Sequence, residues 1–171
     1  FRGKSDFQIL KNQECQFGYR DSIFKRHPDW IIVSATLSLQ KGNIEESRKK
    51  ILEYSKHRNE TQDIGAKCAG CIFKNTGWED AGDKEVLLEK FPELRQFLNR
   101  PTLPTSYLID NCGFKGREVG GAYVSPRHAN FIVNKGGAKA AEVLELISAI
   151  KKAVSDKYGI VIEEEIQLVG F

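Results

Sequence analysis

The feature that most restricts how this chain can fold is a helical pattern near its C-terminal end. Four apolar residues share one face of a helix predicted over residues 140–157: Val143, Ile147, Ile150 and Val154. Gly159 follows shortly after, where helices commonly end on a residue with a left-handed backbone. Because a helix with one apolar stripe must cover it with a second layer, the rest of the chain has to supply that layer.

Stretches rich in β-branched and apolar residues predict the strands of that layer. They lie at residues 30–39, 71–74, 119–124, 129–134 and 159–169, with a short strand or turn at residues 17–24. Further helices are predicted at residues 43–57, on either side of Pro92 within residues 83–98, and at residues 107–112. Strands and helices are mixed along the chain, so we expect an α/β or α+β fold. Its 171 residues fit one large domain or two small ones.

Composition and charge exclude several classes of protein. With 40% hydrophobic and 29% charged residues, the chain is an ordinary globular one. A net charge of +3 is too small to indicate a nucleic-acid partner. No apolar run approaches the roughly 18–20 residues that span a bilayer, and residues 1–6 contain no signal-peptide apolar stretch. The sequence contains no methionine, so we expect that an N-terminal piece is missing from it.

The chain has four cysteines: Cys15, Cys68, Cys71 and Cys112. They are too few for a disulfide scaffold, so we expect thiols in a reducing compartment. Cys68 and Cys71 form a Cys-x-x-Cys motif. A redox dithiol would need a helix N-terminus after the motif, whereas a zinc site would need Cys112 and His128 as further ligands. The third interpretation, which we favour, is one catalytic or structural thiol with an incidental neighbour.

Five blocks of sequence go beyond these general patterns. They are residues 17–25 (FGYRDSIFK), 69–75 (AGCIFKN), 107–116 (YLIDNCGFKG), 120–134 (GGAYVSPRHANFIVN) and 158–170 (YGIVIEEEIQLVG). Each block resembles a stretch of the UDP-N-acetylenolpyruvoylglucosamine reductases, the flavoenzyme family called MurB. All five occur in the family's order, and the resemblance covers residues 15–170. One such block would be a weak signal, but five in order at compatible spacing are a strong one.

The resemblance implies an organisation and a reaction. Residues 1–62 would be the remainder of a FAD-binding lobe, and residues 63–171 a smaller mixed α/β substrate-binding domain. The implied reaction is the FAD- and NADPH-dependent reduction of UDP-N-acetylglucosamine enolpyruvate to UDP-N-acetylmuramate, in peptidoglycan precursor synthesis. The implied location is the bacterial cytoplasm, and we expect a monomer with no membrane partner. The family's Gly-rich flavin loop has no match here.

Three residues match the family's catalytic positions. Arg20 would stabilise the enolate formed on hydride transfer, because a planar guanidinium suits a carboxylate. Cys71 replaces the family's serine as proton donor, and a thiol is a far stronger acid than a hydroxyl. Glu165 would assist, although three successive glutamates are more often a solvated strand edge. The resemblance implies no metal ligand, and it demands that these three residues line one cleft.

Further residues match positions that face the UDP-sugar or the flavin. Asn75, Lys115 and His128 would bind the substrate, with Lys115 as a point charge for the diphosphate. Tyr19 would pack beside Arg20, and Ile32 would touch the isoalloxazine ring. The plainer interpretations are a turn residue for Asn75, a strand-end residue for His128 and a core position for Ile32.

The sequence leaves two other classes of function open. One is a non-catalytic UDP-sugar-binding module, and the other is a Cys-x-x-Cys redox or zinc protein. Residues 76–105 match the family poorly, so the resemblance assigns them no role.

Overall fold

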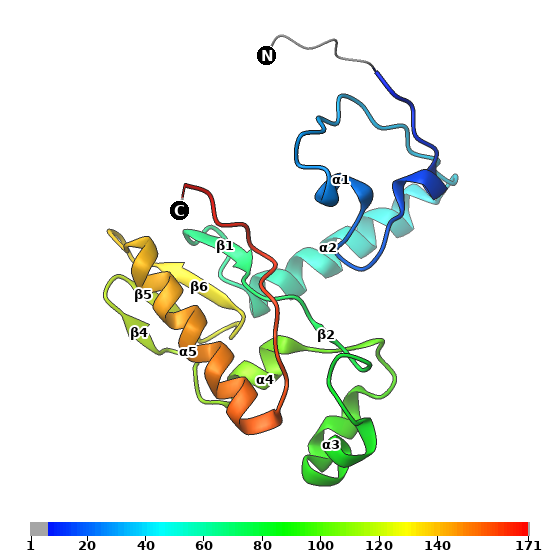
Figure 1. Cartoon of the computed structure of the whole chain (residues 1–171). Helices are drawn as coiled ribbons and strands as arrows, with labels where there is room; N and C mark the ends of the chain where they lie inside the picture. Colours follow the sequence, from blue (N-terminus) through cyan, green and yellow to red (C-terminus); the bar gives the residue numbers. More distant parts are fainter. Residues whose placement is uncertain (1–6, 171) are drawn as a thin grey trace. The chain divides into compact units, whose positions relative to one another are not determined.

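The computed structural model describes residues 7–170, which form two compact units (Figure 1). The first unit reaches to Gly42 and the second begins at Asn43. The predicted domain boundary, at residues 62 and 63, therefore falls inside the second unit, just after its first helix. The mixture of helices and antiparallel strands confirms the predicted α+β class.

The first unit contains two short helical turns, η1 (Asn12–Cys15) and α1 (Ile23–Arg26). Between them Gly18 and Asp21 form an isolated β-bridge, which agrees with the predicted short strand or turn. Cys15 is the one buried side chain among the described residues of this unit. Residues 30–43 form neither helix nor strand, so the predicted strand at residues 30–39 is wrong. A strand requires a hydrogen-bonded neighbour, and none of the described strands pairs with these residues.

The second unit opens with α2 (Ile44–Thr61). Asn43 caps this helix, because its side-chain Oδ1 accepts hydrogen bonds from the backbone amides of Glu45 and Glu46 at 2.8 and 3.2 Å. The predicted helix at residues 43–57 is confirmed and extends one turn further. At the other end Arg127 Nη1 donates to the carbonyls of Asn59 and Gln62, which satisfies acceptors that a helix end leaves open.

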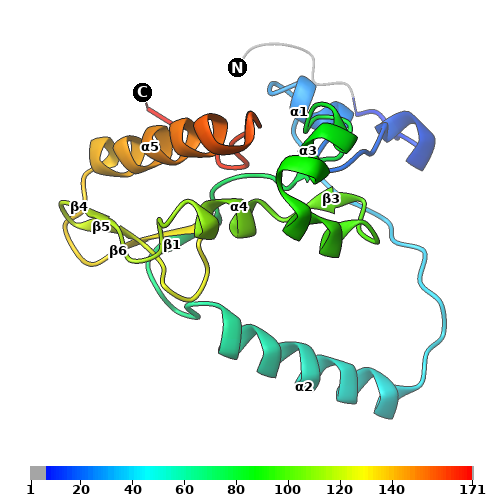
Figure 2. The same cartoon turned by 90° about the horizontal axis from the view of Figure 1, so that it is seen from below.

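A four-stranded antiparallel sheet forms the centre of the second unit. Its strand order is β1 (Cys68–Cys71), β6 (Phe131–Asn134), β5 (Ala122–Val124) and β4 (Glu118–Val119). The long helix α5 (Ala140–Tyr158) lies over one side of this sheet (Figure 2). The predicted apolar stripe of this helix is confirmed, since Ile147, Ile150 and Val154 are buried and Val143 packs against the same core.

Smaller elements complete the second unit. They are α3 (Lys84–Lys90), η2 (Pro92–Phe97), α4 (Thr105–Asn111) and a two-stranded sheet of β2 (Thr76–Gly77) and β3 (Thr102–Leu103). Pro92 separates α3 from η2, as its missing amide predicts. The predicted strand at residues 159–169 is reduced to one bridge, between Glu164 and Phe73. The chain there is extended, but β1 ends at Cys71 and offers it only a short edge.

The turn before β5 anchors the start of α5. Glu142, in the first turn of the helix, accepts hydrogen bonds from the backbone amides of Gly121 and Lys139, both at 3.0 Å. A Cβ on Gly121 would lie 2.8 Å from the backbone nitrogen of Ala138, so this close approach needs glycine. The two hydrogen bonds also lower the pKa of the Glu142 carboxyl.

Candidate functional site

Cys71 and Glu165 come from opposite ends of the second unit and lie on adjacent backbone segments. The Glu165 amide donates to the carbonyl of Ile72, the residue after Cys71, at 2.7 Å. Phe73 and Glu164 form the neighbouring bridge. The structure thus brings together two of the three predicted catalytic residues at the edge of β1.

Hydrogen bonds from Asn130, the residue before β6, hold the backbone next to Cys71. The Asn130 carbonyl accepts from the Ile72 amide at 2.9 Å, and the Asn130 side chain bonds both the amide and the carbonyl of Phe73, at 2.9 and 2.8 Å. Asn130 is buried, so these bonds are shielded from competing water. They fix where β1 ends and where Cys71 lies.

Cys71 belongs to the face of the sheet that α5 does not cover. Its partner on β6 is Phe131, whereas the next residue, Ile132, packs in the core with α5. Side chains alternate between the two faces of a strand, so Cys71 and Phe131 face away from α5. A thiol on this face is half-buried, not sealed in the core.

The two glutamates before Glu165 are engaged in ion pairs. Lys74 Nζ lies 2.9 Å from Glu163, and Lys151 Nζ on α5 lies 2.9 and 3.0 Å from the two oxygens of Glu164. Burial is the largest single effect on Glu164 and raises its pKa, but the hydrogen bonds and charge of Lys151 and a backbone hydrogen bond together leave the pKa lowered. These pairs join the C-terminal segment to the chain that follows β1 on one side and to α5 on the other.

Lys115 and His128 line one pocket of about 260 Å³. Its walls come from η2, α4 and the turn before β6, and they include three cations (Arg100, Lys115 and Arg127) and the carboxylate of Asp110. Lys115 forms a 2.6 Å ion pair with Asp110. Sequence analysis did not single out Arg100 or Arg127, because no motif relates these loop residues to Lys115.

His128 lines this pocket, and its pKa is lowered from the ordinary histidine value, which favours the neutral ring. Burial is the largest cause that lowers its pKa, and the positive charge of Lys115 adds to it, against weaker opposing effects of a backbone hydrogen bond and Asp63. Its Nδ1 atom is buried and has no hydrogen-bond partner among the described residues, and its ring packs 4.5 Å from the ring of Phe131. A neutral imidazole can donate one hydrogen bond and accept another.

Asn75 performs a structural task. Its side-chain Oδ1 accepts a hydrogen bond from the Thr105 amide at 3.2 Å, at the start of α4. Thr105 Oγ1 in turn donates to the Lys74 carbonyl at 2.6 Å. Asn75 therefore joins the end of the Cys71 segment to the helix that carries Asp110, and its role in substrate binding stays a prediction.

Arg20, Tyr19 and Ile32 belong to the first unit. Arg20 sits in the tight turn between Gly18 and Asp21 with φ = 54°, an uncommon backbone conformation for a residue with a side chain. Its guanidinium lies 5.8 Å from the centre of the Tyr19 ring, which confirms that the two pack together. Ile32 is 59% exposed, on a segment without helix or strand, so it is no core strand residue.

The Cys-x-x-Cys motif lies within a strand. Cys68 pairs with Val133 and Cys71 with Phe131, so three steps on β1 match two on β6, and this bulge contains Gly70 with φ = 81°. The redox alternative required a helix N-terminus after the motif, and the structure has a bend and an isolated bridge at Phe73 there. Among residues 7–170, no three His, Cys, Asp or Glu side chains gather as a metal site would require.

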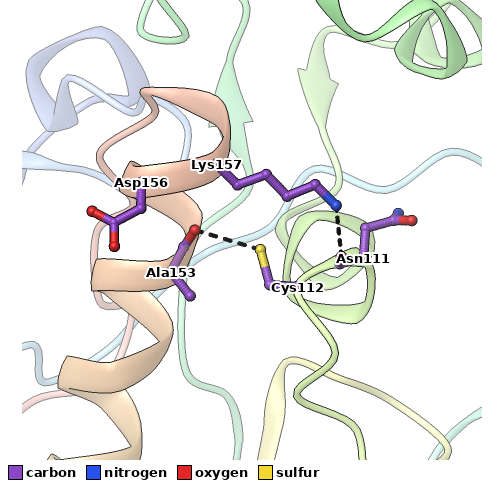
Figure 3. Close-up of a pocket in the computed structure, with 5 residues that line it drawn as sticks. All are labelled: Asn111, Cys112, Ala153, Asp156 and Lys157. Carbon is purple, nitrogen blue, oxygen red and sulfur yellow. Dashed lines mark hydrogen bonds between the residues drawn. The ribbon is translucent and has the colours of Figure 1, made fainter.

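Cys112, the third cysteine of the zinc alternative, lies in a separate hollow between α4 and α5 (Figure 3). Its Sγ is 3.6 Å from the Ala153 carbonyl, and Lys157 Nζ donates to the Asn111 carbonyl at 2.7 Å. Burial raises the pKa of the Cys112 thiol, against the positive charges of Lys157 and Arg117. These contacts join two helix ends, which is a structural role.

The fold and the site define an α+β domain in which the C-terminal segment with Glu165 bonds the backbone that follows Cys71, and which also contains a cationic pocket. The model of the family "UDP-N-acetylenolpyruvoylglucosamine reductase, C-terminal domain" matches residues 62–169. The chain therefore belongs to this family. None of the helices in the described part of the chain is long and apolar enough to cross a membrane.

Individual relatives agree with this assignment. The chain is 39% identical to the UDP-N-acetylenolpyruvoylglucosamine reductase of Fervidobacterium nodosum and 37% identical to that of Anoxybacillus flavithermus, over 98% and 94% of its own length. The crystal structure of UDP-N-acetylenolpyruvylglucosamine reductase (MurB) from Thermus caldophilus matches with a TM-score of 0.67 and 30% identity, over 96% of this chain and 49% of that one. The chain spans about half the length of the curated relatives it matches, 47% of the Fervidobacterium nodosum protein and 45% of the Anoxybacillus flavithermus protein.

Proposed function

We propose that this chain contributes the substrate-binding and proton-donating half of a UDP-N-acetylenolpyruvoylglucosamine reductase. The reaction would reduce UDP-N-acetylglucosamine enolpyruvate to UDP-N-acetylmuramate, in peptidoglycan precursor synthesis in a bacterial cytoplasm. The observation that carries the proposal is the hydrogen bond from the Glu165 amide to the Ile72 carbonyl, because it joins the backbone of Glu165 to the residue that follows Cys71, and both residues match the family's catalytic positions. The family match over residues 62–169 supports it.

Each catalytic residue has a role in this proposal. Cys71 donates a proton to the substrate carbon that carries the developing charge. Glu165 assists at the same position, and the choice of Glu165 among the three glutamates rests on the resemblance, through its spacing to Gly170. Arg20 stabilises the negative charge that spreads onto the substrate carboxylate, and its strained turn is typical of functional sites.

FAD and NADPH enter the proposal through the family alone. Ile32 is the only flavin contact that the resemblance implies, and among the described residues it stands exposed on an irregular segment. The residues described here do not by themselves form a cradle for an isoalloxazine ring. The roles proposed for Cys71, Glu165 and the cationic pocket concern substrate binding and proton transfer.

The test is a calorimetric titration of UDP-N-acetylglucosamine enolpyruvate into the chain, with UMP as the comparison ligand. We expect binding that weakens about tenfold in Lys115→Ala, because one charged contact to a diphosphate is lost. Arg117→Ala is the matched control, since Arg117 lies two residues further along and does not line the pocket. A folded chain that binds neither ligand would contradict the proposal.

A further inference from the structure

Arg100 differs from the other two cations of the pocket in how its charge is compensated. Lys115 is paired with Asp110 at 2.6 Å, and Arg127 donates to the carbonyls of Asn59 and Gln62 at 3.1 and 3.2 Å. No carboxylate among residues 7–170 lies within ion-pair distance of Arg100, whose guanidinium stands 5.5 Å from the centre of the Phe97 ring. A guanidinium stacked on an aromatic ring keeps its hydrogen-bond donors available for another acceptor.

The backbone at Arg100 is fixed independently of its side chain. The Trp78 indole donates to the Arg100 carbonyl at 3.0 Å, and the Arg100 amide donates to the Phe97 carbonyl at 2.9 Å. The residue therefore stands at a defined position on the pocket wall. Replacing its side chain removes none of these contacts.

The charges of the pocket favour an anion with more than one phosphate group. Arg100, Lys115 and Arg127 face a single carboxylate, Asp110, so positive charge is in excess. His128 adds no charge while its ring is neutral. The aromatic rings of Phe97 and Tyr107 line the same pocket and offer an apolar surface beside the cations. A nucleoside diphosphate combines these two properties, with a planar base and two adjacent phosphates.

We propose that Arg100 binds the diphosphate of the nucleotide in this pocket together with Lys115, and that it sets the preference for a nucleoside diphosphate over a monophosphate. This inference rests on the proposed function for its ligand. Arg100 comes from residues 76–105, which match the family poorly, so the resemblance assigns it no role. Its planar fork can bind two phosphate oxygens at once, whereas Lys115 acts as a point charge.

The test compares UDP, UMP, uridine and inorganic pyrophosphate, each titrated calorimetrically into the wild-type chain and three variants. In Arg100→Ala we expect about tenfold weaker binding of UDP and pyrophosphate and an unchanged affinity for uridine. Arg100→Lys should recover part of the affinity, because it keeps the charge and loses the fork. Arg95→Ala is the matched control, since this exposed arginine lies in η2 outside the pocket, and it should change no affinity more than about twofold.

The outcomes separate this inference from the proposed function. Wild-type binding of UDP that Arg100→Ala leaves unchanged overturns the inference and keeps the proposed function. A second outcome is binding of pyrophosphate that depends on Arg100, with UDP binding no more tightly than pyrophosphate. This outcome supports the role of Arg100 at the phosphates and contradicts the sugar-nucleotide ligand. A folded wild-type chain that binds neither UDP nor pyrophosphate overturns both. Unchanged far-UV circular dichroism of Arg100→Ala establishes that the variant is folded.

Discussion

His128, in the candidate pocket, is expected to make the stability of the folded chain depend on pH. Because burial lowers the pKa of His128 in the folded chain, the unfolded chain binds a proton on this residue at a higher pH than the folded chain does. The free energy of unfolding is therefore expected to fall as the pH drops below about 6.5, the ordinary value for histidine. One proton limits the slope to about 1.4 kcal/mol per pH unit, and the partial exposure of the ring reduces it further.

Urea denaturation of the wild-type chain and His128→Gln between pH 5 and 8 measures this effect. We expect His128→Gln to have the flatter pH dependence. His57→Gln serves as the control, because His57 is an exposed residue of α2 and should leave the slope unchanged. Equal slopes for wild type and His128→Gln would contradict the role of the half-buried His128.

Single residues also mark the limit of what the sequence could predict. Lys115 and His128 were expected at the substrate site from the resemblance, and they do line one pocket. Arg100 carries no local signal, because its place beside Lys115 arises from η2 and α4 packing together. Asn130 was noticed only as part of a strand, yet its side chain holds Phe73 from 57 positions away. Contacts over such separations depend on tertiary structure, which no short motif encodes.

At the scale of elements, the ion pair between Lys151 and Glu164 joins α5 to the C-terminal segment. Lys151→Ala should cost about 0.5 kcal/mol of unfolding free energy, because both partners are partly exposed to solvent. The backbone amide of Glu165, which donates to Ile72, should exchange with solvent about two- to fivefold faster. The pKa of Glu164 should rise in this variant, because the Lys151 hydrogen bonds lower it.

Hydrogen exchange read by mass spectrometry checks this prediction, with Lys152→Ala as its matched control. Lys152 is the next residue of the same helix, and it pairs with Asp156 on an exposed surface, at 2.6 Å. It makes no contact with Glu164, so exchange at Glu165 should not change. Equal acceleration in the two variants would mean that helix stability, not the ion pair, protects Glu165.

The elements that the sequence predicted well are those with strong local signals. The apolar stripe and Gly159 define α5, Pro92 divides α3 from η2, and Asn43 caps α2. The failures are all strand predictions: residues 30–39 and 159–169, and in part residues 71–74, where β1 occupies residues 68–71 instead. Strand propensity describes side chains that suit a sheet, whereas a strand forms only where a neighbour supplies the other half of the hydrogen bonds.

At the scale of the whole molecule, the candidate roles divide between the two compact units. The cationic pocket, Cys71 and Glu165 all belong to the unit that begins at Asn43, whereas Arg20 belongs to the unit that ends at Gly42. The proposal gives these parts different portions of the ligand. Under the proposal, the pocket would bind the diphosphate and Arg20 would recognise the enolpyruvyl carboxylate.

This division predicts a crossed pattern of binding losses. Arg20→Ala should weaken UDP-N-acetylglucosamine enolpyruvate about tenfold and leave UDP-N-acetylglucosamine unchanged, because only the first ligand carries the carboxylate. Lys115→Ala should weaken both ligands by a similar factor, because both carry the diphosphate. Arg26→Ala controls for charge in the first unit, since Arg26 is paired with Asp21 at 2.6 Å. Equal affinities of wild type and Arg20→Ala for the enolpyruvyl ligand would remove Arg20 from the site and leave the nucleotide pocket as the chain's own contribution.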